Sequence, residues 1–330
     1  MKICIIKLGA DGDVLRTLPL AKAIFQKNKG SEITWITKGD VATLLEGLSY
    51  ITRFVDVENI ADLEDEEFDA LYNFDVDEEA LELTEVLQAS KKYGFHDDSG
   101  YPVSFNAGGE YYLNTMFDDE LKKKNTKTYQ EMMFEVAELN YQKERIELHL
   151  KKADQEYAKA FAERNNLSKK VIGVHMGSSS RWPSKAWHPQ RVEEFIRLAK
   201  SRGFDIILFG GPNEIEKHSI FAEHLENQGL HIYRNDPHNS KREFAALVSL
   251  CNYMVCNDSF SLHVALGLGV KTIALFFVTS PLEVETYEVG TKIISPLLPQ
   301  FFPERSDEYN EELVKSISAE EVMAVIDKLS

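Results

Sequence analysis

Side chains able to bind a phosphate group follow an apolar run in the middle of the chain. Residues 171–175 (VIGVH) read as a buried strand, and Ser178, Ser179 and Lys185 lie in the loop after it. Serine hydroxyls and backbone N–H groups can hold phosphate oxygens, and a lysine can neutralise their charge. The same pattern also describes an ordinary strand-to-helix connection, so the loop alone leaves both interpretations open.

Two later loops contain residues that suit the rest of a nucleotide. Gly211 lets the backbone approach a ligand closely, and Glu214 could accept hydrogen bonds from a ribose diol, although a carboxylate there also suits the first turn of a helix. Asp258 and Ser259 precede another helix, where they would contact a ligand or cap the helix. His263 follows them and is either part of the site or a packed surface histidine.

Asp13 is the candidate for acid–base chemistry. It follows a first apolar strand, residues 2–8, and stands at the start of a helix, where a carboxylate acts as a general base or as an N-cap. Asp11 and Asp13 also have the spacing of a divalent-cation site, which is the alternative to the metal-free site that we expect. No Gly-x-Gly-x-x-Gly motif follows the strand, and this speaks against a nicotinamide or flavin cofactor.

The elements that must position these residues alternate between strand and helix in both halves of the chain. This alternation predicts an α/β protein with two doubly wound parallel sheets and a cleft between them. We place the boundary in the polar stretch 167–170, so that residues 1–167 form one domain and 168–330 the other. The last helix, residues 319–329, could pack back on the first domain, and we expect residues 91–125 to be irregular.

Charge and composition limit the class of protein. The formal charge is −17, and residues 56–85 alone hold fourteen Asp and Glu with no Lys or Arg. A chain with one acidic surface is not expected to bind nucleic acid. The sequence has neither a signal-peptide pattern nor an apolar window long enough to span a membrane, so we predict a cytoplasmic protein.

Four ordered motifs resemble those of glycosyltransferase family 9, the ADP-heptose:lipopolysaccharide heptosyltransferases. They are IIKLG with GDVLRTLP within residues 5–19, Gly177 with WPSKAW at 182–187, GGPNE at 210–214, and NDS with HVA within 257–265. The sequence departs from the family pattern at Phe260, where a small residue is usual, at residues 276–279 (FFVT), and at Met176.

The resemblance implies the GT-B architecture, in which two Rossmann-like domains face a central cleft. The first domain would bind the acceptor and the second the nucleotide sugar, with inversion at the sugar and no metal. Asp13 would be the general base on the acceptor hydroxyl. The residues implied in donor binding are Ser178, Ser179 and Lys185 for the diphosphate, Gly211 and Glu214 for the ribose, and Asp258, Ser259 and His263 for the sugar and phosphate side.

We therefore predict a glycosyltransferase that moves a sugar, heptose or another, from a nucleotide-diphosphate sugar to a lipopolysaccharide-core or other cell-envelope glycan. An ADP-sugar is the favoured donor, and the acceptor is expected to be an anionic glycan or glycolipid at the inner face of the membrane, where the protein could sit peripherally. The candidate acceptor contacts are Arg16 and the basic cluster, Lys122, Lys123, Lys124 and Lys127; a solvated helix end is the alternative for the cluster.

Two other functions fit the same scaffold. One is a nucleotide-sugar epimerase, which would turn over the donor without an acceptor. The other is a non-catalytic nucleotide- or glycan-binding relative, which would follow if Phe260 filled the sugar site.

Overall fold

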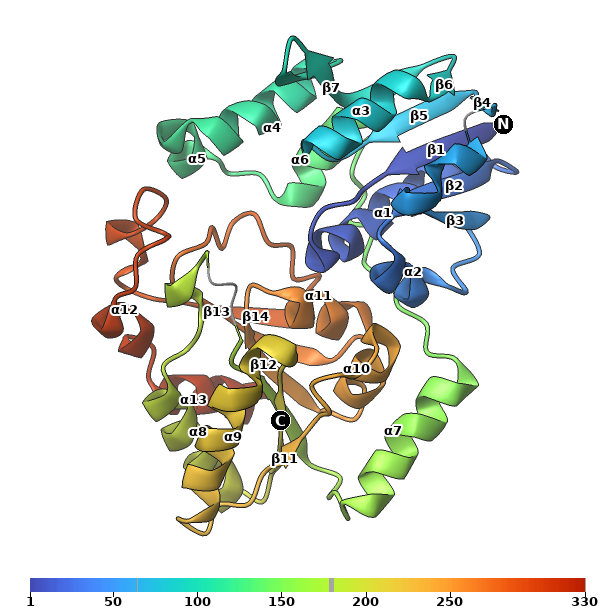
Figure 1. Ribbon diagram of the computed structural model, residues 1–330. Helices are drawn as coiled ribbons and strands as arrows, with labels where there is room; N and C mark the ends of the chain where they lie inside the picture. Colours follow the sequence, from blue (N-terminus) through green and yellow to red (C-terminus); the bar gives the residue numbers. More distant parts are fainter. Residues whose placement is uncertain (64, 178–180, 330) are drawn as a thin grey trace. The chain divides into compact units, whose positions relative to one another are not determined.

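The chain divides into two compact units in a computed structural model that describes residues 1–63, 65–177 and 181–329. The first unit is Met1–His149 with Leu282–Glu285, and the second is Leu150–Pro281 with Thr286–Ser330 (Figure 1). The sequence pattern placed the boundary at residues 167/168, whereas these contacts assign helix α7 (Lys152–Arg164) to the second unit. One reason is an ion pair between Asp154 of α7 and Arg242, both nearly buried.

The first unit contains eight strands and six α-helices among its described residues. The strands are β1 (Lys2–Ile6), β2 (Glu32–Thr37), β3 (Arg53–Asp56), β4 (Glu67–Phe68), β5 (Ala70–Asn73), β6 (Gln88–Ala89), β7 (Lys92–Asp98) and β8 (Tyr101–Ser104). The helices are α1 (Asp11–Lys27), α2 (Gly39–Leu45), α3 (Glu78–Val86), α4 (Ala107–Phe117), α5 (Asp119–Lys124) and α6 (Tyr129–Val136), with a 3-10 segment η1 (Val57–Leu63).

Its main sheet has the strand order β3-β2-β1-β5-β7-β8, and every pair except β7–β8 is parallel. The central strands are apolar at nearly every position because helices cover both faces of such a sheet. The strand order reverses between β1 and β5, so the loops after these two strands diverge and leave a crevice at their carboxyl ends.

The stretch that we expected to be irregular, residues 91–125, is in fact regular. It forms the hairpin β7–β8 and the helices α4 and α5. Ser99 and Gly100 make the hairpin turn, both with positive φ, as a two-residue turn of this kind requires. Gly94 interrupts the strand pattern because a Cβ there would lie 1.8 Å from the carbonyl oxygen of Asn73.

The second unit repeats the same plan. After α7 come β9 (Val171–His175), η2 (Pro183–Lys185), α8 (Pro189–Ser201), β10 (Asp205–Phe209), η3 (Pro212–Glu214), α9 (Ile215–Glu226), β11 (Tyr233–Arg234) and α10 (Lys241–Val248). Then follow β12 (Tyr253–Asn257), α11 (Phe260–Gly267), β13 (Lys271–Phe276), β14 (Gly290–Ile294), η4 (Leu298–Gln300), α12 (Glu311–Lys315) and α13 (Ala319–Leu329).

Its sheet has the order β11-β10-β9-β12-β13-β14 and is parallel throughout. Helices α8, α9 and α13 bury their apolar side chains on one face in a single core cluster. On the other face Phe244 of α10 packs on Phe209 of β10, with 5.2 Å between the ring centroids. The last helix, α13, thus packs on the sheet of the second unit.

Both units are therefore doubly wound α/β domains, which confirms the predicted fold class. The three cysteines are buried and unpaired, as small apolar side chains would be. No helix in the described part of the chain has the length and hydropathy needed to cross a membrane.

Candidate functional site

The predicted donor residues of the second unit gather where its strand order reverses, between β9 and β12. Lys185 comes from the loop after β9, and Asp258 from the loop after β12. The Lys185 ammonium lies 3.5 Å from an Asp258 carboxylate oxygen, and both side chains are about one-fifth exposed. A reversal of this kind leaves room for a ligand at the strand ends. Ser178 and Ser179 lie outside the described residues.

Asn257 holds the two sides of this crevice together. Its side-chain amide donates to the carbonyl of Gly177 at 2.9 Å and to the carbonyl of Lys185 at 3.0 Å. The side chain is almost fully buried at the last position of β12. The lysine loop is therefore fixed from the neighbouring strand, although nothing in the sequence pattern around Asn257 predicted this role.

The WPSKAW motif is anchored on its far side by the C-terminal segment. The Ser184 hydroxyl donates to the carbonyl of Glu308 at 2.8 Å and accepts from the N–H of Asn310 at 2.8 Å. The Trp187 indole N–H donates to the carbonyl of Ile317 at 3.1 Å. Lys185 thus lies in a loop whose backbone is held at several points, and this limits the reach of its ammonium.

Helix α11 directs its N-terminus at the same crevice. Ser259 is the N-cap residue, but its hydroxyl contacts the carbonyl of Asn257 (3.3 Å) and the hydroxyl of Ser261 (2.8 Å) and makes no cap hydrogen bond. The positive end of a helix favours an anion such as a phosphate. His263 is buried, with its Nε2 4.0 Å from the Asp258 carboxylate.

Phe260 is the first residue of α11 and turns toward α10. Its ring lies 5.5 Å from the Phe244 ring between centroids, and the Lys241 ammonium lies over it at 5.2 Å. These contacts place the unusual side chain against a neighbouring helix.

Glu214 is the last residue of η3, in the loop after the next strand, β10. Its Oε2 accepts a hydrogen bond from the N–H of Gly211 at 2.8 Å. A Cβ added to Gly177 would lie 2.9 Å from the Glu214 carboxyl group, so a glycine is needed where the two loops meet. The carboxylate is thus held beside the lysine loop, in the loop that follows β10, the strand next to β9.

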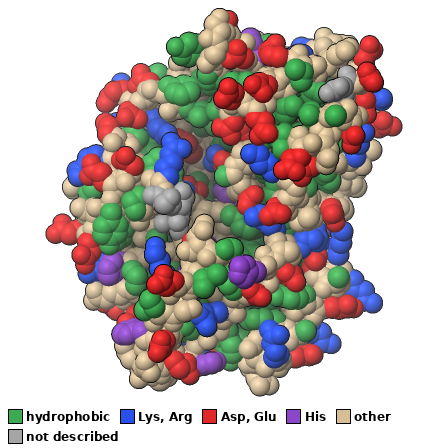
Figure 2. Space-filling view, viewed as in Figure 1, with side chains coloured by type: hydrophobic (Ala, Val, Ile, Leu, Met, Phe, Trp, Pro, Cys, Tyr) green, Lys and Arg blue, Asp and Glu red, His purple; other side chains and the backbone are tan. Residues whose placement is uncertain are grey.

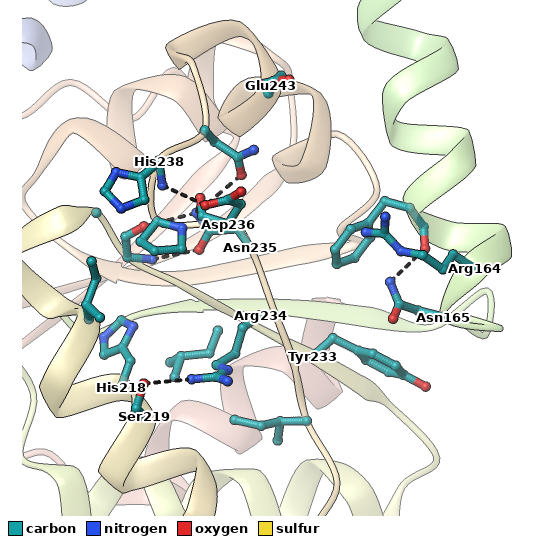
Figure 3. A pocket seen from close by; sticks show the side chains of 18 of the residues that line it. Arg164, Asn165, His218, Ser219, Tyr233, Arg234, Asn235, Asp236, His238 and Glu243 are labelled. Carbon is teal, nitrogen blue, oxygen red and sulfur yellow. Dashed lines mark hydrogen bonds between the residues drawn. The ribbon is translucent and has the colours of Figure 1, made fainter.

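A polar cavity of about 770 Å³ lies beyond Glu214, along β10 and β11. In Figure 3, Asn235, Asp236 and His238 stand near one end, while Arg164 and Asn165, from the end of α7, stand near the other. The buried Asn235 amide accepts from the N–H of Gly210 and donates to its carbonyl, so it fixes the Gly210-Gly211 turn at the mouth of the cavity.

Two histidines lie close to the glycines of these loops, His175 beside Gly177 and His218 beside Gly210. Burial, with a smaller effect of the neighbouring His218, lowers the pKa of His175 to about 4, although the nearby Asn257 side chain opposes the shift. Burial and the nearby Arg234 and Lys217 lower the pKa of His218 to about 4. Both imidazoles are therefore neutral at neutral pH and add no charge to the site.

In the first unit, Asp13 is the third residue of α1, whose N-cap is Ala10, so Asp13 does not cap the helix. An Asp13 carboxylate oxygen lies 2.9 Å from Nε of Arg16. The Arg16 guanidinium in turn lies over the Tyr129 ring, 3.7 Å from its centroid, and the Tyr129 hydroxyl is 2.9 Å from that of Thr17. Arg16 therefore contacts the candidate base, in addition to any contact with an acceptor.

Lys7 and Asp75 lie at the same crevice and were not predicted as site residues. They form a buried ion pair at 3.2 Å, at the ends of the two strands between which the order reverses. No group of three or more His, Cys, Asp or Glu able to hold a metal ion occurs among residues that the structure describes.

The basic cluster is partly paired within its own surface. Lys127 contacts both oxygens of Glu135 and lies over the ring of Tyr111, and Lys123 lies 3.4 Å from Glu120. Figure 2 likewise shows acidic and basic side chains interspersed over the visible face of the protein. The four lysines therefore do not act as four equivalent free charges.

The chain resembles one known family over most of its length. Residues 60–313 match the family model described as glycosyltransferase family 9 (heptosyltransferase). Lipopolysaccharide core heptosyltransferase OpsX of Haemophilus influenzae is 22% identical over 308 residues, which cover 89% of this chain and 84% of that protein. Lipopolysaccharide heptosyltransferase 2 of Salmonella typhimurium is 28% identical over 110 residues, 33% of this chain and only 30% of its own length.

The fold agrees with a solved structure as well. The E. coli ADP-heptose lps heptosyltransferase II superposes with a TM-score of 0.75 and 17% identity, covering 100% of this chain and 98% of that one. At this level of identity the similarity establishes the fold, and it confirms the expected GT-B class of two parallel-sheet domains.

Proposed function

The chain belongs to glycosyltransferase family 9, and we propose that it transfers a heptose or a related sugar from an ADP-sugar to a lipopolysaccharide-core or other cell-envelope glycan. The family assignment makes it a glycosyltransferase. The donor nucleotide, the sugar, the acceptor, inversion at the sugar and independence from metal are parts of the proposal. The ADP-heptose named for the E. coli structure and the lipopolysaccharide-core substrate named for the Haemophilus protein support it.

The observation that carries the donor assignment is the order of side chains across the second sheet. Lys185 and the α11 N-terminus flank the β9–β12 crevice, Glu214 lies in the loop after β10, and the polar cavity follows along β10 and β11. Neighbouring strands are about 4.8 Å apart, so these features span the length of a nucleoside diphosphate. We assign the diphosphate to the crevice, the ribose diol to Glu214 and the base to the mouth of the cavity.

The chemistry of transfer assigns a role to each charged group. The acceptor hydroxyl must lose its proton as it attacks the sugar, and Asp13 would take that proton. The departing diphosphate gains negative charge, which Lys185 and the helix N-terminus would stabilise. A general base for the acceptor hydroxyl and stabilisation of the departing diphosphate suit a single displacement, which inverts the sugar.

The acceptor side of the proposal rests on fewer contacts. Arg16 beside Asp13 and the lysines of α5 are the cations that an anionic glycan or glycolipid would meet. An acceptor of this kind is anchored in a membrane, so we propose peripheral association at the inner face during turnover.

A thermal-shift panel tests the donor assignment directly. ADP, UDP, GDP and CDP are compared with ADP-heptose at equal concentrations, and stabilisation reports binding to the native state. We expect ADP and ADP-heptose to raise the unfolding temperature most. Selective stabilisation by another nucleoside diphosphate would contradict the ADP assignment. If none of the nucleotides raised the unfolding temperature, the assignment of a nucleotide site to this crevice would be wrong.

A further inference from the structure

Lys7 and Asp75 form a buried ion pair beside the loop that leads into α1, the helix of Asp13. Lys7 follows β1 and Asp75 follows β5, at the point where the order of the first sheet reverses. The ammonium and the carboxylate are 3.2 Å apart, and both residues are only 5% exposed. A buried pair of this kind is costly to desolvate and is weak evidence for stability on its own. Its position next to the candidate base suggests another role.

Asp75 is fixed by the backbone of the same loop. Its Oδ2 accepts from the N–H groups of Leu8 at 3.0 Å and Gly9 at 2.5 Å, and its Oδ1 accepts from that of Val76 at 3.0 Å. A Cβ added to Gly9 would lie 2.9 Å from Asp75 and 3.0 Å from the Lys7 ammonium. The chain between Lys7 and α1 therefore packs directly on the ion pair.

Charged and titratable groups from several elements surround this point. Burial lowers the pKa of Lys7, but Tyr129, Asp75, Asp13 and Tyr112 more than offset it, and the net pKa is raised. Lys7 therefore stays charged and is close enough to Asp13 for the two charges to interact.

The charged groups linked to Asp13 carry both signs. Arg16 on α1 contacts Asp13 directly, Lys7 at the end of β1 interacts with it through its charge, and Asp75 after β5 is the carboxylate paired with Lys7. Tyr129 of α6 and Tyr112 of α4 complete the surroundings of the lysine, and Asp11 precedes Asp13 on α1.

We propose that Lys7 is a positioning residue for Asp13, anchored by Asp75, whose charge keeps the Asp13 carboxylate ionised and orients the loop before α1. This inference rests on the proposed role of Asp13 as the general base. A nearby cation favours the charged form of a carboxylate, whereas a nearby carboxylate disfavours it. Lys7 and Asp75 must therefore affect the protonation of Asp13 in opposite directions.

The experiment follows the titration of the Asp13 carboxyl carbon by NMR in protein labelled at aspartate, with the signal assigned through Asp13→Asn. Lys7→Met should move the titration midpoint up, because an opposite charge that favours the ionised carboxylate is lost. Lys7→Arg keeps the charge and should restore most of the wild-type midpoint. This measurement needs no substrate, so it is independent of the proposed reaction.

Asp75→Asn is the second variant, and it keeps the test valid if Lys7→Met does not fold. It removes the opposing carboxylate, so the Asp13 midpoint should move down. Lys22→Met is the matched control, because Lys22 lies on the same helix and pairs with Glu147 at 2.8 Å. Nine residues of helix place it about 13 Å from Asp13 along the axis, so it should leave the midpoint unchanged.

The directions in which the two charge-removing variants shift the Asp13 titration midpoint test the proposal. Opposite shifts support the positioning role, whereas no shift, or equal shifts in one direction, would reduce the pair to a structural contact. In the transfer assay, Lys7→Met should lower kcat and move the acidic limb of its pH profile to higher pH, with the donor KM unchanged. If Asp13→Asn kept full transfer activity, the proposed reaction would fail whatever the NMR titration showed.

Discussion

The ammonium of Lys185 lies 3.5 Å from the carboxylate of Asp258, across the crevice between β9 and β12. The two charges come from segments more than seventy residues apart and compensate each other in the absence of a ligand. A diphosphate that enters the crevice must draw the lysine toward itself and tolerate the carboxylate. The pair therefore predicts opposite effects when either partner is removed.

Lys185→Ala should weaken the binding of ADP by roughly 30- to 1000-fold, because it removes a cation and exposes the diphosphate to Asp258. Adenosine should bind almost as before, since it has no charge for Lys185 to meet. Calorimetry with both ligands measures the two effects. Equal losses for ADP and adenosine would mean that Lys185 supports the fold.

Asp258→Asn should instead tighten the binding of ADP, because a like charge is removed beside the diphosphate. Lys200→Ala is the matched control, since Lys200 forms a similar pair with Asp205 at 3.2 Å, at the amino end of β10. It should change ADP binding by less than about twofold. Weaker ADP binding in Asp258→Asn would show that Asp258 contacts the nucleotide itself.

Gly177→Ala tests the position of the Glu214 carboxylate. The new Cβ would lie 2.9 Å from that carboxyl group and displace it from the Gly211 N–H. We expect ADP binding to weaken about tenfold, the worth of one hydrogen bond to a charged group. The 2′,3′-dideoxy form of ADP lacks the ribose diol and should bind wild type and variant alike. An equal loss of affinity for both nucleotides would show that Glu214 does not bind the ribose diol.

The convergence of Lys185 and Asp258 could be predicted from sequence, because each follows an apolar strand of a parallel sheet and such strand ends share one edge. The role of Asn257 could not, since a buried amide that links two loops distant in sequence leaves no local pattern. The same holds for Lys7 and Asp75, whose contact depends on which strands become neighbours.

The hairpin β7–β8 shows a different limit of prediction from sequence. Its strands pass through Gly94, which packs on Asn73, and through a two-residue turn at Ser99 and Gly100. The glycines that the fold requires there made the stretch look irregular, because periodicity does not report close backbone contacts. The Ser99-Gly100 dipeptide was the local signal that could have revealed the hairpin, because such pairs mark tight turns.

His218→Asn should flatten the dependence of stability on pH. The pKa of His218 is about 4 in the folded protein against an ordinary 6.5, so the unfolded chain binds more protons between these values. Stability is fully present above pH 6.5 and falls as the pH drops toward 4. Between pH 7 and pH 5, the free energy of unfolding measured with urea should fall by about 2 kcal/mol less in the variant than in wild type. The exposed His231→Gln should behave like wild type.

We expect only some lysines of the basic cluster to contribute to the binding of the acceptor. Lys122→Gln with Lys124→Gln should raise the acceptor KM, more at low salt than at high salt, while leaving donor affinity unchanged. Lys127→Gln is the internal comparison, because its ammonium already contacts Glu135, and it should change KM less. An acceptor KM that stays constant at low salt in the double variant would identify the cluster as a solvated helix end.

The measurement that tests the central claim is the transfer of radiolabelled heptose from ADP-heptose to a heptose-free lipopolysaccharide core in excess EDTA. Wild type should transfer the label with inversion at the anomeric carbon. Asp13→Asn should lose about 10²–10⁴ in kcat while still binding ADP. Wild-type transfer that requires added Mg²⁺ or Mn²⁺, or an Asp13→Asn variant that transfers at the wild-type rate, would contradict a metal-independent transferase in which Asp13 is the base.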